Sequence, residues 1–214
     1  MISLVLPLCG AEIVGAMEGA IATAKPAIKV AALCGSLRKA SCHRGLVRAA
    51  IQLCSESIEG MHIEYVDIKP LPFLNTDLES GGSFPEPVEA FRRKVLDADS
   101  ILFASPEYNY SVTGPLKNAI DWASRSPNVW ADKPAAIVST GGGFGGGRSQ
   151  YHLRQIGVFL DLHFINKPEL CIFEFRPPQK FDSDGNLIDP ESKERLKQLL
   201  LSLQAFTLRL QDKS

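Results

Sequence analysis

The stretch Gly35-Ser-Leu-Arg-Lys-Ala-Ser-Cys-His-Arg44 places two hydroxyl side chains around an arginine, directly after the apolar run "IKVAALC". Ser36, Arg38 and Ser41 can donate hydrogen bonds to phosphate oxygens, and Gly35 lets the backbone approach a ligand closely. A helix that follows would direct its positive end at the same anion. These residues predict a phosphate-binding loop, although the serines could equally cap a helix beside a solvated Arg38.

A second candidate loop, "PEYNYSVTGP", runs from Pro106 to Pro115. It combines an aromatic side chain at the end of an apolar run with the amide of Asn109 and two hydroxyl groups. Planar ligands stack on aromatic rings and are oriented by a few amide or hydroxyl partners. An ordinary turn rarely contains two tyrosines so close together, so this loop is interpreted as part of a site for a flat ligand.

A third loop is the glycine run from Gly141 to Gly147. Gly141, Gly143 and Gly146 satisfy the pattern G-x-G-x-x-G, and Asp161 stands 20 residues after Gly141, so a Rossmann dinucleotide site is a competing interpretation. That pattern belongs in the first strand-helix unit, with the acid closing the next strand, whereas Asp161 ends a predicted helix. We favour glycines that let a flat ring system lie against bare backbone. A Walker-type nucleotide loop is excluded, because no G-x-x-x-x-G-K-[ST] occurs.

Alternating apolar runs and helical patterns predict the elements that position these loops. The expected strands are 28–34, 62–68, one within 100–108, 134–140 and 169–173. The expected helices are 44–57, 86–97, 114–125, 148–162 and one after Asp189 with an apolar stripe at Leu196, Leu199, Leu200, Leu203 and Leu210. Helix 86–97 should expose Glu89, Arg92, Arg93 and Asp97.

Near-continuous hydrophobicity in the strands predicts an α/β fold, with a doubly wound five-stranded parallel sheet covered by helices on both faces. Ligands bind such sheets at the carboxyl ends of the strands. All three loops follow predicted strands, so we expect them to meet there.

Composition excludes several classes of function. The net charge of −1 without a long basic run argues against a nucleic-acid surface or a polybasic membrane anchor. The four histidines lack ligand spacing, so no metal site is expected. Five cysteines without a C-x-x-C pair indicate a reduced, cytoplasmic protein. Residues 28–214 should form one domain, and 1–27 an atypical amino-terminal extension with neither a signal peptide nor a membrane span.

With the three loops considered together, the sequence resembles the NADPH-dependent FMN reductase family of flavodoxin-like proteins, especially its quinone- and chromate-reducing members. The resemblance covers roughly residues 28–205. It depends on "GSLRKAS", "SPEYNYSVTGPLKNAIDWAS" and "STGGGFGGGRSQ", of which the second is long and specific.

The resemblance implies a flavodoxin-like fold that binds FMN. The FMN phosphate would be held by Ser36, Arg38, Ser41 and His43. Family members usually carry asparagine in place of His43, whose imidazole N–H could replace the amide donor. The isoalloxazine ring would lie along Pro106, Glu107, Tyr108 and Asn109 and against Ser139, Thr140, Gly141, Gly142 and Gly143.

The implied function is an NAD(P)H:quinone oxidoreductase, in which FMN carries a two-electron, ping-pong reduction of a small-molecule quinone or similar acceptor. NADPH or NADH is the co-substrate, and Arg38, Lys39 and Arg44 could favour NADPH. The family implies a homodimer or homotetramer. Tyr110, Trp122 and Trp130, near the ligand edge, could pack across its subunits. The alternatives are a general FMN, chromate or azo reductase, a flavodoxin-type electron carrier without nucleotide oxidation, and a regulatory protein that only kept the fold. The acceptor, the nucleotide preference and the oligomer number stay open.

Overall fold

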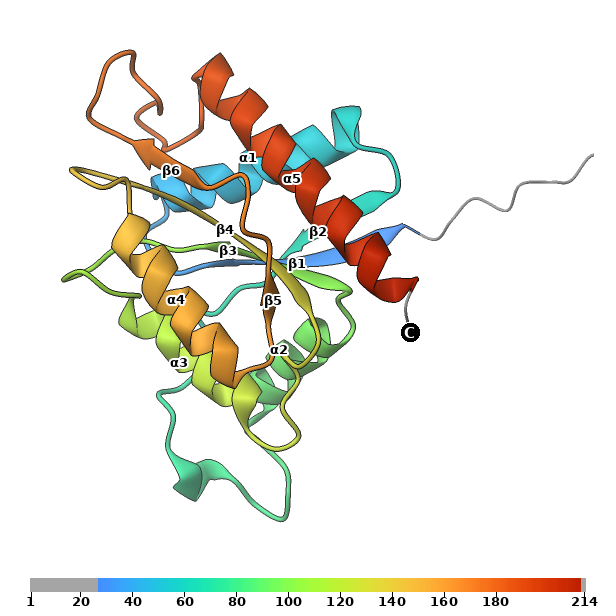
Figure 1. Cartoon of the computed structure of the whole chain (residues 1–214). Coiled ribbons are helices and arrows are strands. Elements are labelled where there is room, and N and C mark those ends of the chain that lie inside the picture. The colour runs from blue at the N-terminus through green and yellow to red at the C-terminus, as the bar shows by residue number, and fades with distance from the viewer. Residues whose placement is uncertain (1–26, 213–214) are drawn as a thin grey trace, which may run out of the picture.

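The structure, a computed structural model, describes residues 27–212 (Figure 1). The expected extension at residues 1–27 therefore lies outside the described residues, except for Ala27. The chain forms a parallel sheet in the order β2-β1-β3-β4-β5, with β6 also paired to β4. This is the strand order of flavodoxin-like doubly wound sheets. The strands are β1 (Ile28–Cys34), β2 (Met61–Tyr65), β3 (Ser100–Ala104), β4 (Pro134–Gly141), β5 (His163–Phe164) and β6 (Leu170–Phe173).

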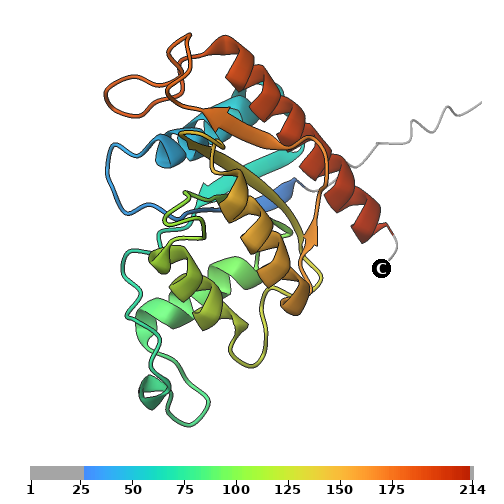
Figure 2. The ribbon, with the colours of Figure 1, turned by 60° about the vertical axis from the view of Figure 1, so that its left-hand side comes forward.

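Helices cover both faces of the sheet, as predicted (Figure 2). Side chains alternate between the two faces of a strand, so Val30 and Ala32 of β1 join one apolar cluster while Ala31 and Leu33 join the other. The first cluster lies beneath α1 (Cys42–Ser57) and α5 (Pro190–Gln211). The second lies beneath α2 (Glu86–Leu96), α3 (Gly114–Ser124) and α4 (Gly147–Phe159). The predicted stripe of α5 is buried at Leu196, Leu199, Leu200 and Leu203.

The sheet has one short strand that the sequence patterns did not predict. Strand β5 pairs with the start of β4, at Pro134 and Ala135, and β6 pairs with its end, from Val138 to Gly141. The two short strands are therefore pieces of one edge beside β4, interrupted around Pro168, which lacks a backbone N–H for a ladder bond. A two-residue strand is too short to show a periodic pattern.

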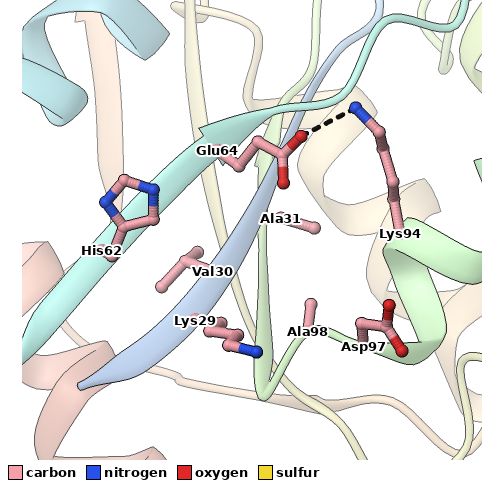
Figure 3. Close-up of a pocket in the computed structure, with 8 residues that line it drawn as sticks. All are labelled: Lys29, Val30, Ala31, His62, Glu64, Lys94, Asp97 and Ala98. Carbon is pink, nitrogen blue, oxygen red and sulfur yellow. Dashed lines mark hydrogen bonds and ion pairs between the residues drawn. The ribbon is translucent and has the colours of Figure 1, made fainter.

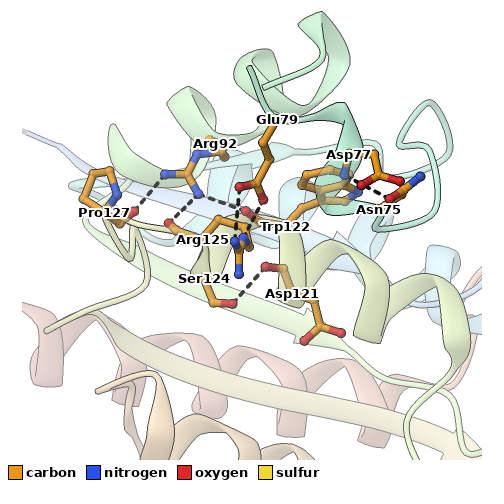
Figure 4. Close-up of polar contacts among 9 residues, drawn as sticks. All are labelled: Asn75, Asp77, Glu79, Arg92, Asp121, Trp122, Ser124, Arg125 and Pro127. Carbon is orange, nitrogen blue, oxygen red and sulfur yellow. Dashed lines mark hydrogen bonds and ion pairs between the residues drawn. The ribbon is translucent and has the colours of Figure 1, made fainter. Parts of the chain in front are cut away.

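Arg92 was predicted to be exposed on α2, and that prediction is wrong, since the side chain is only 5% exposed. Its guanidinium donates to the carbonyl oxygens of Trp122 at 2.9 Å, Arg125 at 2.9 Å and Pro127 at 2.7 Å (Figure 4). The last carbonyl groups of a helix have no partner within the helix, so the end of α3 offers acceptors that a buried arginine can satisfy. The guanidinium also lies 4.3 Å from the ring centroid of Phe84.

The same region fixes the long loop between β2 and α2, which projects from the body of the molecule (Figures 1 and 2). Arg125 pairs with Glu79, with Nε 2.6 Å from Oε1, and Trp122 Nε1 donates to the carbonyl oxygen of Pro72 at 2.8 Å. Trp122 and Trp130 are fully buried inside the subunit. The expectation that these two tryptophans pack across subunits is therefore wrong.

The loop between β6 and α5 folds back against the beginning of α1. Arg48 on α1 donates to the side chain of Asn186 at 2.9 Å, and Gly185 adopts a φ of 74°. A Cβ atom at Gly45 would overlap the carbonyl oxygen of Gly185, and one at Gly185 would lie 2.6 Å from the carbonyl oxygen of Ala40. This loop therefore supports the backbone that enters α1 from behind.

Gly45→Ala should lower the free energy of unfolding by roughly 1–3 kcal/mol, because the added methyl group meets backbone that cannot move without displacing the loop. Gly114→Ala is the matched control, since it also replaces a helical glycine but its Cβ would meet open space. The control should be neutral or stabilising by up to about 1 kcal/mol, the helix-propensity gain that both variants share. Urea unfolding of both variants measures the difference, and equal stabilities would show that α1 and this loop are not in tight contact.

Candidate active site

The exits of β1, β3 and β4 meet at the carboxyl-terminal edge of the sheet, as the doubly wound fold predicts. The backbone N–H of Gly35 donates to the carbonyl oxygen of Ala104 at 2.9 Å, and the hydroxyl of Thr113 donates to the carbonyl oxygen of Gly35 at 2.6 Å. A Cβ atom at Gly35 would lie 2.8 Å from the ring of Pro106. Only glycine allows the first and second loops to approach this closely.

The first loop presents two buried serines and an exposed arginine beside the start of α1. Ser36 and Ser41 are buried, and Arg38 is exposed. The hydroxyl oxygen of Ser36 accepts from the backbone N–H of Arg38 at 3.3 Å, which orders the loop. Ser41 is the residue before α1, but its side chain makes no capping bond to the helix. The hydroxyl is therefore not used as a helix cap, which was the alternative interpretation of this residue.

The second loop is a tight hairpin turn between Tyr108 and Ser111. The two residues exchange backbone hydrogen bonds of 3.0 and 3.1 Å, and Asn109 and Tyr110 both have positive φ, at 52° and 68°. Two consecutive left-handed residues define a type I′ turn. The turn leaves the rings of Tyr108 and Tyr110 54% and 65% exposed. The helix α4 supports it from the side, because Nδ1 of His152 lies 2.9 Å from the hydroxyl of Ser111.

Glu107 joins the second loop to the third. Its carboxylate accepts from the backbone N–H of Arg148 at 2.9 Å and from the guanidinium of the same residue at 3.1 Å. The guanidinium carbon lies 3.9 Å from the ring centroid of Tyr110 and 3.7 Å from that of Phe144. The flat cation is thus in contact with an aromatic ring from each loop, which fixes the two loops relative to each other.

The third loop depends on glycine for its conformation and on Ser139 for its order. Gly145 and Gly146 have φ values of 57° and 82°, which disfavour other residues. The hydroxyl of Ser139 donates to the carbonyl oxygen of Gly145 at 2.7 Å and accepts from Gln150 at 2.8 Å. Ser139 is fully buried. The structure therefore places this side chain behind the loop, where it supports the glycines, and not on the side that faces a ligand.

The three loops enclose a hollow of about 190 Å³. Among residues 27–212, three buried hydroxyl oxygens have no hydrogen-bond partner, those of Ser100, Ser105 and Thr140, and of these residues Thr140 lines this hollow. A buried polar atom without a partner is uncommon, and a ligand hydroxyl or ring nitrogen would satisfy it. The residues present fit FMN, with serines and an arginine at one end and bare backbone and an aromatic ring at the other. The lining residues are Ser36, Arg38, Ser41, Cys42, His43, Pro106, Glu107, Tyr108, Thr140, Gly141 and Glu174.

Four residues predicted to contact the flavin do not line the hollow in the structure. Ser139 lies behind the third loop, and Asn109, Gly142 and Gly143 are exposed at the rim. The assignment of FMN contacts to all thirteen residues stays a prediction.

Two lining residues were not predicted. The thiol of Cys42 lies 3.3 Å from Oε1 of Glu174, and burial together with this carboxylate raises the pKa of the thiol to about 11. Glu174 comes directly after β6, which matches the last predicted strand. The three loops were located by the polar side chains that come directly after each strand, and the same rule applied to the last strand would also locate Glu174.

His43 is buried and neutral beneath the hollow. Its side chain is 7% exposed, and its Nε2 accepts a hydrogen bond from the backbone N–H of Thr140 at 3.1 Å. Burial, with a contribution from the positive charge of Arg38, lowers the pKa of His43 to about 3. The imidazole is therefore uncharged at neutral pH.

A larger hollow, of about 260 Å³, lies at the opposite edge of the sheet, where the strands begin (Figure 3). Lys29, His62 and Lys94 line it together with Glu64 and Asp97. Lys94 and Glu64 already form an ion pair at 2.7 Å. It lies away from the strand exits, and two of its charged groups already satisfy each other, so we assign no ligand to it.

Residues 27–212 contain neither a metal-binding cluster nor a membrane-spanning helix. No group of three or more His, Cys, Asp and Glu side chains in this range lies together as a metal site would require. No helix in this part of the chain combines the length and apolar character needed to cross a membrane.

Comparison with known proteins gives a consistent family. The sequence model of the family described as NADPH-dependent FMN reductase matches residues 28–175. An NADPH:quinone oxidoreductase of Arabidopsis thaliana is 74% identical over 194 residues, covering 91% of this chain and 99% of the relative. An NAD(P)H:quinone oxidoreductase of Solanum tuberosum is 71% identical, covering 89% and 98%. The solved structure of FerB, a flavoenzyme NAD(P)H:(acceptor) oxidoreductase from Paracoccus denitrificans, matches with a TM-score of 0.71 at 30% identity, covering 86% of this chain and 98% of that one.

The low pKa of His43 makes a prediction about acid stability. An unfolded histidine titrates near 6.5, so between that pH and about 3 the unfolded chain binds a proton that the folded chain does not. The free energy of unfolding should therefore fall as the pH is lowered through this range, by up to about 1.4 kcal/mol per pH unit from this group.

Urea unfolding at pH 7, 6 and 5 should show a shallower fall for His43→Gln than for the wild type. His62→Gln, which removes an exposed histidine on β2, is the matched control and should keep the wild-type slope. Identical slopes for wild type and His43→Gln would show that His43 is protonated equally in both states.

Proposed function

This chain belongs to the NADPH-dependent FMN reductase family, and from that premise we propose that it is an FMN-dependent NAD(P)H:quinone oxidoreductase that reduces quinones by two electrons. The main structural support is the convergence of three strand exits around a hollow whose buried Thr140 hydroxyl has no partner among residues 27–212. A phosphate-bearing ligand with a flat head satisfies both ends of that hollow.

Ser36, Arg38 and Ser41 would hold the FMN phosphate at the beginning of α1. The guanidinium gives a charge-assisted bond, and the helix start contributes its N–H groups and dipole. Pro106 to Tyr108 and Thr140 to Gly141 would form the two walls against the isoalloxazine ring.

FMN, when bound, accepts hydride from the nicotinamide and passes two electrons to an acceptor. The protein's task is then to bind the flavin, to orient it and to adjust its reactivity. Backbone N–H groups of the glycine loop can stabilise negative charge on the ring system. The exposed Tyr108 and Tyr110 border an open rim, where a planar nicotinamide or quinone can approach.

The preference for NADPH depends on which basic residues are available to its extra phosphate. Arg44 is already engaged, since it donates to the hydroxyl of Tyr65 at 2.6 Å and lies 3.8 Å from the carboxylate of Asp67. Arg38 and Lys39 are exposed beside the hollow. Because Arg38 is assigned to the FMN phosphate, we assign the discrimination between NADPH and NADH to Lys39.

The assembly is proposed to be a homodimer or homotetramer in the cytoplasm. The exposed aromatic rings of Tyr110, Phe144 and Tyr151 near the hollow favour association of subunits there. The four described cysteines are free thiols, which suits a reducing compartment.

A flavodoxin-type electron carrier is the second candidate, because it would share the fold and the cofactor. Such carriers usually have a strongly acidic face, and the net charge of −1 argues against one here. A general FMN, chromate or azo reductase differs from the proposed enzyme only in the acceptor.

Arg38→Ala should weaken FMN retention by roughly tenfold or more, because a charge-assisted hydrogen bond contributes about 1.5–3 kcal/mol. Lys39→Ala, the next residue and also exposed, is the control and should keep its FMN through purification. The ratio of flavin absorbance to protein absorbance after gel filtration measures retention. Full flavin content in Arg38→Ala would place the phosphate elsewhere.

The protein should be yellow, and anaerobic NADPH should bleach its visible flavin band until a quinone restores it. An electron carrier would keep its colour when NADPH is added, so this measurement separates the two candidates. Steady-state kcat/KM values for several quinones, chromate, azo dyes and free flavin then rank the acceptors.

A further inference from the structure

The backbone hydrogen-bond ladder between β3 and β4 is interrupted at the strand exits. The backbone N–H of Ser105 donates to the carbonyl oxygen of Val138 at 2.9 Å. In a parallel ladder with evenly spaced bonds, the next bond would join the N–H of Thr140 to the carbonyl oxygen of Ser105. The N–H of Thr140 instead donates to Nε2 of His43 at 3.1 Å.

The other end of that missing bond, the carbonyl oxygen of Ser105, lies close to the same imidazole, since the Ser105 backbone opposes the effect of burial on the pKa of His43. This carbonyl oxygen accepts from the hydroxyl of Ser149 at 3.1 Å. A neutral imidazole has one donor and one acceptor nitrogen. Because Nε2 accepts from Thr140, Nδ1 carries the proton, and we assign the nearby carbonyl oxygen of Ser105 as its acceptor.

We propose that His43 is a positioning residue whose imidazole replaces one backbone bond of the sheet and thereby sets the separation between the exits of β3 and β4. This inference rests on the proposed function, because the gap that results is the one that receives the flavin ring. Pro106 follows Ser105, and Gly141 follows Thr140, and both line the hollow. Replacement of the His43 imidazole, which joins the two strands, therefore moves both walls of the site.

The same geometry removes His43 from the phosphate contacts that the family resemblance implied. Nε2 is used inside the protein and the proton on Nδ1 is assigned to Ser105, so neither nitrogen is left to donate to a phosphate oxygen. Ser36, Arg38 and Ser41 remain for that task. Riboflavin has the same ring system as FMN but no phosphate. Removal of a positioning residue should therefore lower the affinity for both flavins, whereas removal of a phosphate contact should lower the affinity for FMN alone.

The experiment is a titration of flavin-free protein with FMN and, separately, with riboflavin, followed by quenching of flavin fluorescence. His43→Ala should weaken both flavins by the same factor, roughly tenfold or more, so that the FMN-to-riboflavin affinity ratio stays at the wild-type value. Arg38→Ala should reduce that ratio, and the size of the reduction is the reference for the loss of a phosphate contact. His43→Gln should recover most of the affinity for both flavins, because its amide oxygen can accept from the N–H of Thr140.

Two results would overturn the inference: a His43→Ala protein whose affinity ratio falls as it does in Arg38→Ala, or one whose affinities for both flavins are unchanged. A second readout needs no flavin. The ¹⁵N spectrum of the imidazole at pH 7 should show the neutral tautomer with the proton on Nδ1, and the amide of Thr140 should exchange faster in His43→Ala. The opposite tautomer would overturn the proposed geometry. If the wild-type protein shows the expected tautomer but binds neither flavin, the proposed function alone would be overturned.

Discussion

The divergence of β3 and β4 at their carboxyl ends is the constraint on which the rest of the site depends. A parallel sheet must stop its backbone hydrogen bonds somewhere, and each group left unpaired in the interior costs free energy. Here the N–H of Thr140 donates to an imidazole that reaches it from α1, and the carbonyl oxygen of Ser105 accepts from the hydroxyl of Ser149. The strands can therefore separate without unpaired groups, and a hollow opens between the loops that follow them.

Strained backbone also occurs next to the hollow, and neighbouring contacts offset the strain. Asn109 and Tyr110 both occupy the left-handed region, which costs about 1–3 kcal/mol for a residue held in such a conformation. The hairpin bonds between Tyr108 and Ser111 compensate in part. The contact of Arg148 with the ring of Tyr110, and its ion pair with Glu107, hold the turn against α4.

Sequence patterns predicted the sheet, the helices on both faces and the edge where the loops meet, because those features follow from the periodicity of apolar residues and from one rule about parallel sheets. They failed where a long or buried polar side chain finds partners distant in the sequence. Arg92 satisfies carbonyl groups at the end of α3. His43 bridges two strands that neither precede nor follow it directly. Periodicity assigns a residue to a face of a helix, but it does not report which unsatisfied backbone groups lie within reach of that face.

The position of the site at the small hollow beside the strand exits, and not at the larger hollow of Figure 3, also has a physical reason. The larger hollow lies where the strands begin, close to the carboxyl-terminal end of α2, and two of its charged residues, Lys94 and Glu64, pair with each other. The smaller one lies where α1, α3 and α4 begin, each directly after a strand exit. Helix starts contribute unpaired N–H groups and positive potential, whereas helix ends contribute carbonyl groups and negative potential. Because the strands are parallel and each connecting helix runs back antiparallel to them, helices begin at the strand exits, and the connectivity of the chain selects that edge for an anionic ligand before any side chain is considered. The side chains of the three loops then determine which anion it is.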